Sequence, residues 1–335
     1  MCMRSRIFIW VFLMASMAGM AQDAHFSMFY SSSLYLAPSF AGATGKNRLA
    51  ASYRNQWPEA DKGYVTYTFS YDHHFEKLNS GMGVLFFNDV AGTGNLSTTN
   101  IGLVYSYDFN LNHLVHIRPG MNFMYTQRGL DFNNLIWGDQ MSAAGNAPAS
   151  AEAVAYNNVG DLDFSVSLLT YGEKFWAGFT IDHLLQPNQS LYYNEFESGN
   201  LARVPIKYTV FGGSKHIVNQ TLLRPIPTVM HFAFLYKQQE DYSQLDLGFY
   251  YYYNPLVLGL WYRGIPGISK NRKNDAVILL AGLKTKNINI GYSYDFTVSK
   301  LISSTGGSHE FSISYTFSKP TKKRRPKKMV PCPEF

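Results

Sequence analysis

The chain has 335 residues, of which 46% are hydrophobic, 16% aromatic and 16% charged. A typical soluble domain carries about 25% charged residues, so this chain is poor in charge, and its apolar content excludes a disordered protein. A helical membrane protein is excluded as well, because a membrane-spanning helix needs about 20 apolar residues and the strong apolar run covers only Ile7 to Met14. A large soluble β protein and a membrane β-barrel remain.

The N-terminus has the pattern of a secretory signal peptide. Arg4 and Arg6 precede the apolar run and small residues follow it, with a predicted cleavage site near Ala21/Gln22. We therefore assign residues 1–21 to a signal peptide. Cys2 is lost with this peptide, so Cys332 remains alone and no internal disulfide framework is expected.

Residues 22–46 follow the signal peptide and do not alternate between polar and apolar positions. Two interpretations are open, an irregular periplasmic leader or a plug folded into the lumen of a barrel. The bore of a barrel of this size needs filling unless it conducts, which favours the plug.

Period-two alternation dominates residues 47–318 and predicts β-strands. In the last such segment, Phe311, Ile313 and Tyr315 share one face, and small polar residues share the other. In a membrane barrel the apolar face meets lipid and the polar face lines the lumen. The signal peptide, the strand lengths and the tyrosines at strand ends favour a membrane barrel over a soluble one.

We expect about fourteen strands, with twelve or sixteen as alternatives. They lie near residues 47–54, 63–75, 81–89, 97–109, 114–128, 160–170, 174–183, 203–217, 221–237, 242–253, 256–264, 275–285, 287–297 and 308–318. Short and long connections mostly alternate along the chain. The long connections are at 55–62, 129–159, 184–202, 265–274 and 298–307. Short turns at one end and long loops at the other are typical of outer-membrane barrels, and an even strand number returns both termini to the periplasm.

Residues 319–335 form a basic tail. The tail holds seven cationic residues and one acidic residue. Its net charge of +6 therefore equals the formal net charge of the whole chain. Its prolines prevent a continuous helix, and we predict an extended docking segment in the periplasm, with a merely solvated tail as the alternative. The candidate partner-binding residues here are Lys322, Lys323, Arg324, Arg325, Lys327, Lys328, Cys332 and Phe335. A nucleic-acid partner is not expected for an exported chain.

Catalytic signatures are missing from the sequence. It contains no GxSxG, HExxH, CxxC or P-loop pattern. His73 and His74 are adjacent, so on a strand they face opposite sides and cannot share a metal ion. We predict no enzyme activity, no catalytic residue, and no metal or cofactor site.

Several motifs resemble one known family. YRNQWP at 53–58 is the most specific, and it follows the mature start QDAHFSMFYSSSLYLAPSFAGATG at 22–45. Next come GYVTYTFSYD (63–72), NDVAGTG (88–94), GLDFNNLIWGDQ (129–140), GYSYDFTVSKLISSTGGSHEFSISYTF (291–317) and the terminal CPEF (332–335). In this order they resemble the PorP/SprF family of the type IX secretion system in Bacteroidota.

The resemblance implies an all-β, FadL-like outer-membrane barrel that serves the secretion and gliding apparatus. It implies three kinds of partner: the lipid bilayer of the outer membrane, secretion-machinery proteins on the periplasmic side, and secreted cargo such as an adhesin. Arg and Trp side chains anchor protein interfaces well, so we predict a structured functional loop at 53–58. Its candidate partner-binding residues are Tyr53, Arg54, Asn55, Gln56, Trp57 and Pro58.

Two functions therefore compete. The first is a secretion component that binds protein partners and supports secretion or surface anchoring of cargo. The second is a FadL-like channel for hydrophobic small molecules. An outer-membrane hydrolase or acyltransferase has almost no support in the sequence.

Overall fold

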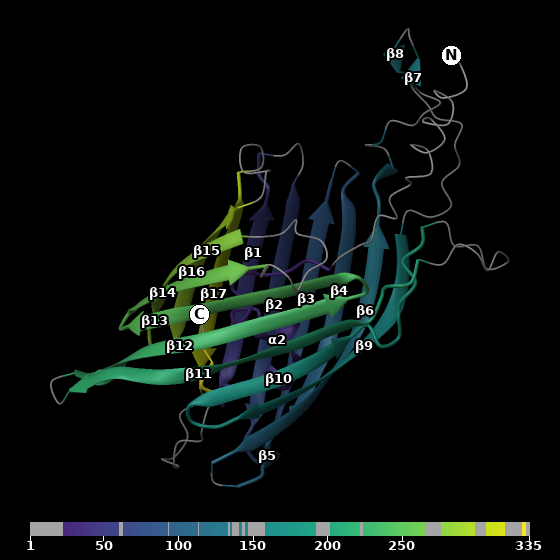
Figure 1. The fold of residues 1–335 in the computed structure, drawn as a ribbon. Coiled ribbons are helices and arrows are strands. Elements are labelled where there is room, and N and C mark those ends of the chain that lie inside the picture. Colours follow the sequence, from purple (N-terminus) through teal and green to yellow (C-terminus); the bar gives the residue numbers. More distant parts are fainter. Residues whose placement is uncertain are drawn as a thin grey trace.

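In the computed structural model, the chain forms a closed antiparallel β-barrel of 14 strands (Figure 1). The structure describes residues 23–59, 63–92, 94–112, 114–132, 135, 141–142, 145–146, 158–191, 202–221, 224–264, 276–298, 306–318 and 330–332. The barrel strands are β1 (Asn47–Gln56), β2 (Tyr64–Phe75), β3 (Ser80–Ala91), β4 (Leu96–Tyr107), β6 (His116–Gly129), β9 (Asn158–Tyr171), β10 (Phe175–Asp182), β11 (Lys207–Thr221), β12 (Arg224–Gln239), β13 (Tyr242–Tyr253), β14 (Leu256–Arg263), β15 (Ala276–Lys284), β16 (Ile288–Thr297) and β17 (Ser308–Phe317).

Neighbouring strands in the chain are neighbours in the barrel. β5 (Phe109–Asn110) is a short extra strand paired with β6, and β7 (Met141–Ser142) pairs only with β8 (Gly145–Asn146). The ring closes where β1 pairs with β17, with Arg54 opposite Glu310. The predicted strand number is confirmed, and the fourteen predicted segments match the barrel strands one for one.

The two ends of the barrel differ. We name the end that holds residues 76–79, 172–174, 254–255 and 285–287 the turn end; the chain enters β1 and leaves β17 there. The opposite end, uppermost in Figure 1, carries the connections 57–63, 183–206 and 298–307, and we name it the loop end. Among the described residues, no helix is long and apolar enough to cross a bilayer.

The outer face of the barrel is apolar, as the alternation predicts. On β17, Phe311, Ile313 and Tyr315 are 52%, 50% and 42% exposed, while Ser312 and Ser314 are buried. The same pattern recurs on β2, β4 and β6. The expected orientation, with apolar side chains outward and small polar ones inward, is therefore confirmed for these strands.

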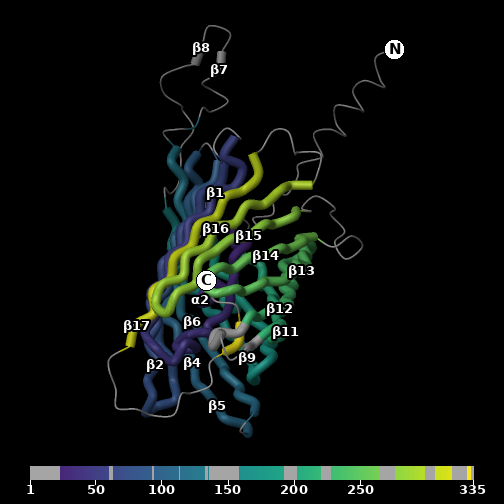
Figure 2. The backbone as a smooth tube through the Cα atoms, turned by 90° about the vertical axis from the view of Figure 1, so that its left-hand side faces the viewer, coloured from purple at the N-terminus to yellow at the C-terminus, as the bar shows by residue number. Residues whose placement is uncertain are grey.

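Residues 23–46 fill the lumen, and we call them the plug. The plug contains the helix α2 (Ser33–Leu36) and the 3-10 turn η1 (Pro38–Phe40), and most of its residues are buried. In the two perpendicular views this purple segment lies inside the ring of strands (Figures 1 and 2). The plug runs from contacts at the loop end, where Asp23 meets Lys207, to contacts at the turn end, where Gly42 meets Asp72.

The inner wall has two chemically different parts. The polar arc is the inward face of β16, β17, β1 and β2, with buried Ser52, Arg54, Thr66, Thr68, Ser70, Ser293, Asp295, Glu310, Ser312 and Ser314. The apolar arc belongs to β11 to β15, with buried Phe211, Leu235, Tyr250, Val257, Trp261, Ile278 and Leu280. The expectation of a small, polar inner face is wrong for the apolar arc, because apolar plug side chains pack against it.

Candidate functional site: the plugged lumen

A buried cluster of charges holds the start of the plug against the barrel wall. We call Arg54, Arg263, Asp246, Asp295 and Glu310 the arginine cluster. Arg54 pairs with Asp295 at 2.9 Å and with Glu310 at 3.2 Å, and Arg263 pairs with Asp295 at 2.9 Å. Arg263 also reaches Asp246 at 3.3 Å. All five side chains lie on the inward face of the barrel near the loop end, on the neighbouring strands β1, β17 and β16 and, beyond β15, on β14 and β13.

Ser27 of the plug sits at the centre of this cluster. Its hydroxyl donates to Asp295 at 2.6 Å and accepts from Arg54 at 2.7 Å and Arg263 at 2.8 Å. The backbone N–H groups of Ser27 and Met28 donate to the two oxygens of Glu310, at 2.7 and 3.0 Å. Asp295 and Glu310 thus receive hydrogen bonds both from the wall arginines and from these donors of the plug. The plug therefore completes the hydrogen-bond network of the wall.

A second set of charges fixes the first described residue of the plug. Asp23 accepts from His183 at 2.8 Å and from Lys207 at 2.6 Å. His183 also bonds Asp163 at 2.6 Å, and Lys207 pairs with Asp182 at 3.2 Å. We call these five residues the loop-end cluster. Burial alone lowers the pKa of His183, but Asp23 and Asp163 outweigh that effect and raise it to about 10, so this imidazole is cationic at neutral pH.

The turn end of the plug is held through its backbone. The Arg118 guanidinium donates to the carbonyl oxygens of Ser39 and Ala41. The Gly42 N–H donates to Asp72 at 2.8 Å, and Asp72 also pairs with Arg48 at 2.8 Å. Because these contacts use main-chain groups, they fix the path of the plug with little dependence on its side chains.

Two wall glycines let the plug backbone lie directly on the strands. A Cβ atom added at Gly81 would stand 2.0 Å from the Ala41 carbonyl oxygen, and one at Gly120 would stand 2.2 Å from the Ser39 nitrogen. Neither position tolerates a side chain without moving the plug.

Aromatic contacts join the plug to the apolar arc and its neighbour β10. The ring centroids of Phe29 and Trp261 lie 4.9 Å apart, and those of Phe40 and Phe211 lie 5.6 Å apart. The Trp176 indole N–H donates to the Tyr30 hydroxyl at 2.8 Å. Edge-to-face and tilted aromatic pairs at such distances are favourable. The plug is thus a part of the hydrophobic core as well as of the charge network.

The six residues of the YRNQWP motif do not form one surface loop. β1 extends through Gln56, so the predicted loop at 55–62 begins two residues too early. Arg54 is buried in the lumen with 2% exposure, where it contacts the plug and the inner wall, and partner binding by this residue stays a prediction. Gln56 accepts a hydrogen bond from Arg54, whereas Tyr53 and Asn55, on either side of Arg54, occupy outward positions.

Trp57 and Pro58 do lie in the loop-end connection. Trp57 has a φ of +59°, a region that costs a residue other than glycine about 1–3 kcal/mol. Its N–H donates to the Gly307 carbonyl oxygen at 2.8 Å, and its ring packs edge-on against Tyr64. Pro58 follows it and is exposed. The motif therefore divides between a lumen anchor and a structured loop.

The predicted tail residues divide in a similar way. Lys322, Lys323, Arg324, Arg325, Lys327, Lys328 and Phe335 lie outside the described residues. Cys332 is 7% exposed and belongs to the hydrophobic cluster of the lumen, together with Val330. Val330 and Cys332 are therefore packed against the lumen, and docking of the tail to a periplasmic partner stays a prediction.

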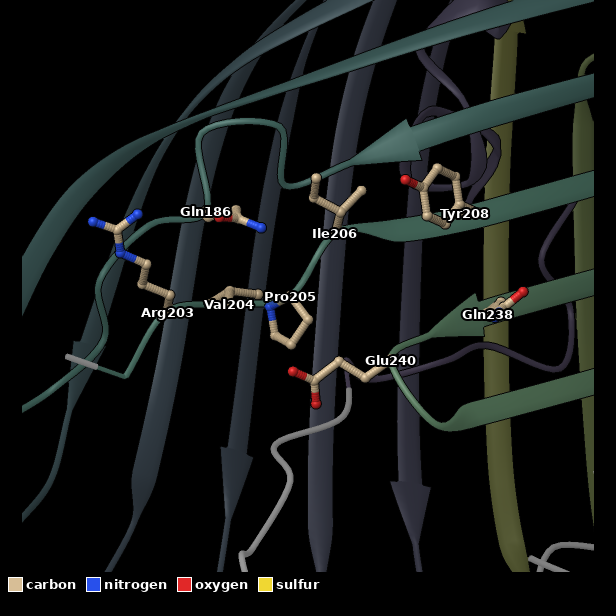
Figure 3. A pocket seen from close by; sticks show the side chains of 8 residues that line it. All are labelled: Gln186, Arg203, Val204, Pro205, Ile206, Tyr208, Gln238 and Glu240. Atoms are coloured by element: carbon tan, nitrogen blue, oxygen red, sulfur yellow. The ribbon is translucent and has the colours of Figure 1, made fainter. Parts of the chain in front are cut away.

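A small pocket lies at the loop end, where the connection after β10 approaches the turn between β12 and β13 (Figure 3). It has a volume of about 340 Å³, and its lining includes Arg203, Pro205, Tyr208 and Glu240. It lies beside the loop-end cluster, because Tyr208 follows Lys207 on β11. Within the described part of the chain, no group of three His, Cys, Asp or Glu residues is placed to hold a metal ion.

The sequence interpretation missed Ser27, Arg263, Asp295 and Glu310. A signal was present, because Asp295 and Glu310 occupy inward positions among serines in strands that are otherwise uncharged on that face. A buried carboxylate needs a cationic partner, and Arg54 and Arg263 lie on strands that the topology brings near.

A closed barrel with an apolar outer face, whose lumen is filled by the residues before its first strand, defines a plugged outer-membrane β-barrel. The family model described as type IX secretion system membrane protein PorP/SprF matches residues 18–315. The chain therefore belongs to the PorP/SprF family, as its motifs predicted. No curated protein matches it.

Solved structures with a similar strand arrangement have low sequence identity to the chain. The CymD monoaromatic hydrocarbon channel is 12% identical, with a TM-score of 0.49 and coverage of 89% of this chain and 95% of CymD. The toluene transporter TbuX of Ralstonia pickettii is 10% identical, with a TM-score of 0.49 and coverage of 85% and 93%. The KdgM porin is 10% identical, with a TM-score of 0.37 and coverage of 81% and 99%.

Proposed function

We propose that this protein supports the secretion or surface anchoring of cargo proteins such as adhesins, as an outer-membrane part of the type IX secretion and gliding machinery. The family match over residues 18–315 carries the proposal. By the usual arrangement of outer-membrane barrels, the turn end faces the periplasm and the loop end faces the outside. Cargo then meets the loop end, and the machinery meets the turn end.

The lumen favours a protein-binding component over an open channel. The plug is fixed at both ends by buried ion pairs and hydrogen bonds, through Asp23, Ser27 and Gly42. Removing one member of a buried ion pair leaves an uncompensated charge and costs about 3–5 kcal/mol. A plug held in this way opposes easy passage through the lumen and leaves the barrel ends as the surfaces for partners.

The loop-end surface includes Trp57 and Pro58, and its role is tested by the double variant Trp57→Ala, Pro58→Ala. We expect less cargo on the cell surface while the amount of heat-modifiable barrel in the outer membrane stays unchanged. Leu185→Ala is the matched control, because Leu185 is an exposed apolar residue in another loop-end connection. Barrel abundance that falls in step with surface cargo would restrict the motif to a structural role.

For the turn end, we propose that the six cations between Lys322 and Lys328 attract an acidic surface of a periplasmic machinery protein. Such attraction is screened over about 8 Å at physiological ionic strength. Replacing the six cations by Gln should reduce co-purification of the machinery, whereas Lys77→Gln, at another turn-end position, should not. Unchanged co-purification would contradict docking by the tail.

The apolar arc is the observation that supports a second candidate, a FadL-like channel for hydrophobic small molecules. Trp261, Ile278 and Leu280 give the lumen an apolar wall of the kind that such ligands need. Uptake of a hydrophobic tracer into liposomes that contain the purified barrel tests this function. Uptake above that of empty liposomes would support the channel, and normal cargo display in the absence of the protein would contradict the secretion role.

A further inference from the structure

The C-terminal residues 330–332 provide a second filling of the lumen. Val330, Pro331 and Cys332 are all buried, although they follow the last barrel strand. Val330 and Cys332 belong to the same hydrophobic cluster as Tyr30 of the plug and Tyr250, Val257 and Ile278 of the apolar arc. Cys332 lies close enough to interact electrostatically with both Tyr30 and Tyr250.

We propose that the apolar arc, together with Tyr30, forms a groove that binds a proline-containing extended peptide, and that Val330–Cys332 is its releasable occupant. Aromatic-lined grooves recognise such segments because proline pre-organises the peptide and presents a flat apolar ring. Here Pro331 and Pro333 flank Cys332, and the cluster that contains Cys332 includes tyrosine and tryptophan side chains.

The plug has an attachment that the described C-terminal residues have not been shown to share. The plug is fixed by the arginine cluster, the loop-end cluster and the Arg118 contacts, in which charged groups bond to its backbone and to Ser27. The C-terminal segment contributes small apolar side chains and a proline that has no N–H to donate. Burial of apolar area is roughly proportional to that area and is not directional. The short C-terminal segment is therefore the part of the filling that another peptide can replace.

In this arrangement the groove is a peptide-binding site that is occupied by the C-terminal segment of the same chain. A protein partner that carries an exposed apolar–proline–small segment would bind the groove after the C-terminus leaves it. Residues 319–329 would then be tethered only to β17, because they would lose their second attachment at Val330.

The reactivity of Cys332 tests the proposal directly. In a Cys2→Ser chain Cys332 is the remaining cysteine, and its labelling by PEG-maleimide is followed by gel shift on the folded barrel in detergent. The reference is Leu78→Cys in a Cys332→Ser chain, because Leu78 is 64% exposed in a turn. We expect Cys332 to react about tenfold more slowly, or slower still, because labelling requires local opening.

Two comparisons decide whether the groove holds the segment. Val330→Asp should accelerate the labelling of Cys332, because it would place an unpaired charge among apolar groups. Tyr250→Ala should do the same, while Tyr251→Ala, at the outward neighbouring position on β13, should not. Heat-modifiable migration confirms that each barrel is folded. Equal labelling of Cys332 and the Leu78→Cys reference would overturn the proposal.

Exchange is tested with a synthetic peptide of residues 327–335 that has Ser in place of Cys332. An excess of this peptide should speed the labelling of Cys332, and a peptide with Pro331 and Pro333 replaced by Asp should not. Slow labelling that neither peptide changes would make the segment a permanent part of the core and would contradict a releasable occupant.

Discussion

The polar arc and the apolar arc hold the plug by different physics. In the polar arc, serines and threonines surround a few charged side chains and form directed hydrogen bonds with the plug, such as that between Ser32 and Ser52 at 3.0 Å. In the apolar arc, large side chains such as Trp261 and Phe211 pack against plug aromatics. The charged contacts of this arc with the plug, from Arg263 and Lys207, lie near the loop end. Alternation determines which side chains point inward. Whether those side chains are polar or apolar matches the part of the plug that they face.

The largest effect is expected from removing the arginine at the centre of the polar arc. Arg54→Ala leaves Asp295 and Glu310 buried with less compensating charge, which should cost about 3–5 kcal/mol. Limited proteolysis should then cleave the plug faster in the folded barrel. Asn55→Ala is the control, because its side chain occupies the next, outward position. Equal cleavage of the two variants would show that the arginine cluster does not retain the plug.

In the apolar arc, a truncation should act through packing instead. Leu280→Ala should destabilise the barrel by about 2–5 kcal/mol, because it removes buried contacts and leaves a cavity. Leu279→Ala, at the adjacent outward position, should have a smaller effect. The midpoint of denaturant unfolding in detergent measures both. A larger loss for Leu279→Ala would reverse the assignment of inward and outward faces on β15.

The outer face is shared by both arcs, and a charge there should act independently of the plug. Ile313→Lys places a charge on the lipid side of β17, which costs about 2–4 kcal/mol near the middle of the bilayer. The yield of heat-modifiable barrel in membranes should fall. Leu78→Lys, in a turn, should assemble normally, and equal yields would argue against lipid contact at Ile313.

The smallest effect concerns the pH dependence of the loop-end cluster. The pKa of His183 is raised to about 10 in the folded protein, against about 6.5 when unperturbed. The charged His183 imidazole therefore contributes its full stabilisation of the folded state below about pH 6.5, and this contribution is lost as the pH rises through 10. Proteolysis near Asp23 should accelerate between neutral pH and pH 10 or above. The change should be modest, because Lys207 still holds Asp23, and His183→Gln should remove it.

Much of the barrel could be predicted from the sequence, because strand alternation is a local property. The fourteen segments, their outward apolar faces and the long and short connections all follow from residues close together in the chain. The serines of β17 illustrate the limit: Ser314 is inward as predicted, yet it is buried and accepts a hydrogen bond from Asn289. Its surroundings depend on strands and plug residues distant in sequence.

The candidate site depended on such distant contacts. Ser27 meets Arg54, Arg263, Asp295 and Glu310 only because the barrel closes around the plug. The inward position of Arg54, by contrast, could be predicted from the alternation of β1, because Arg54 is two residues from Ser52 and shares its inward face. The interpretation of residues 53–58 as one loop overlooked this alternation.

The plug bridges the seam at which the barrel closes, and this has a consequence for the order of assembly. Ser27 accepts a hydrogen bond from Arg54 on the first strand, while the N–H groups of Ser27 and Met28 donate to Glu310 on the last strand. The pairing of β1 with β17 joins segments at opposite ends of the barrel sequence, so it carries the largest loop-closure entropy of any strand pair. A plug already bound to β1 carries donors that meet β17 as it arrives. The N-terminal segment is therefore placed where it could guide ring closure, because it contacts both strands of the seam.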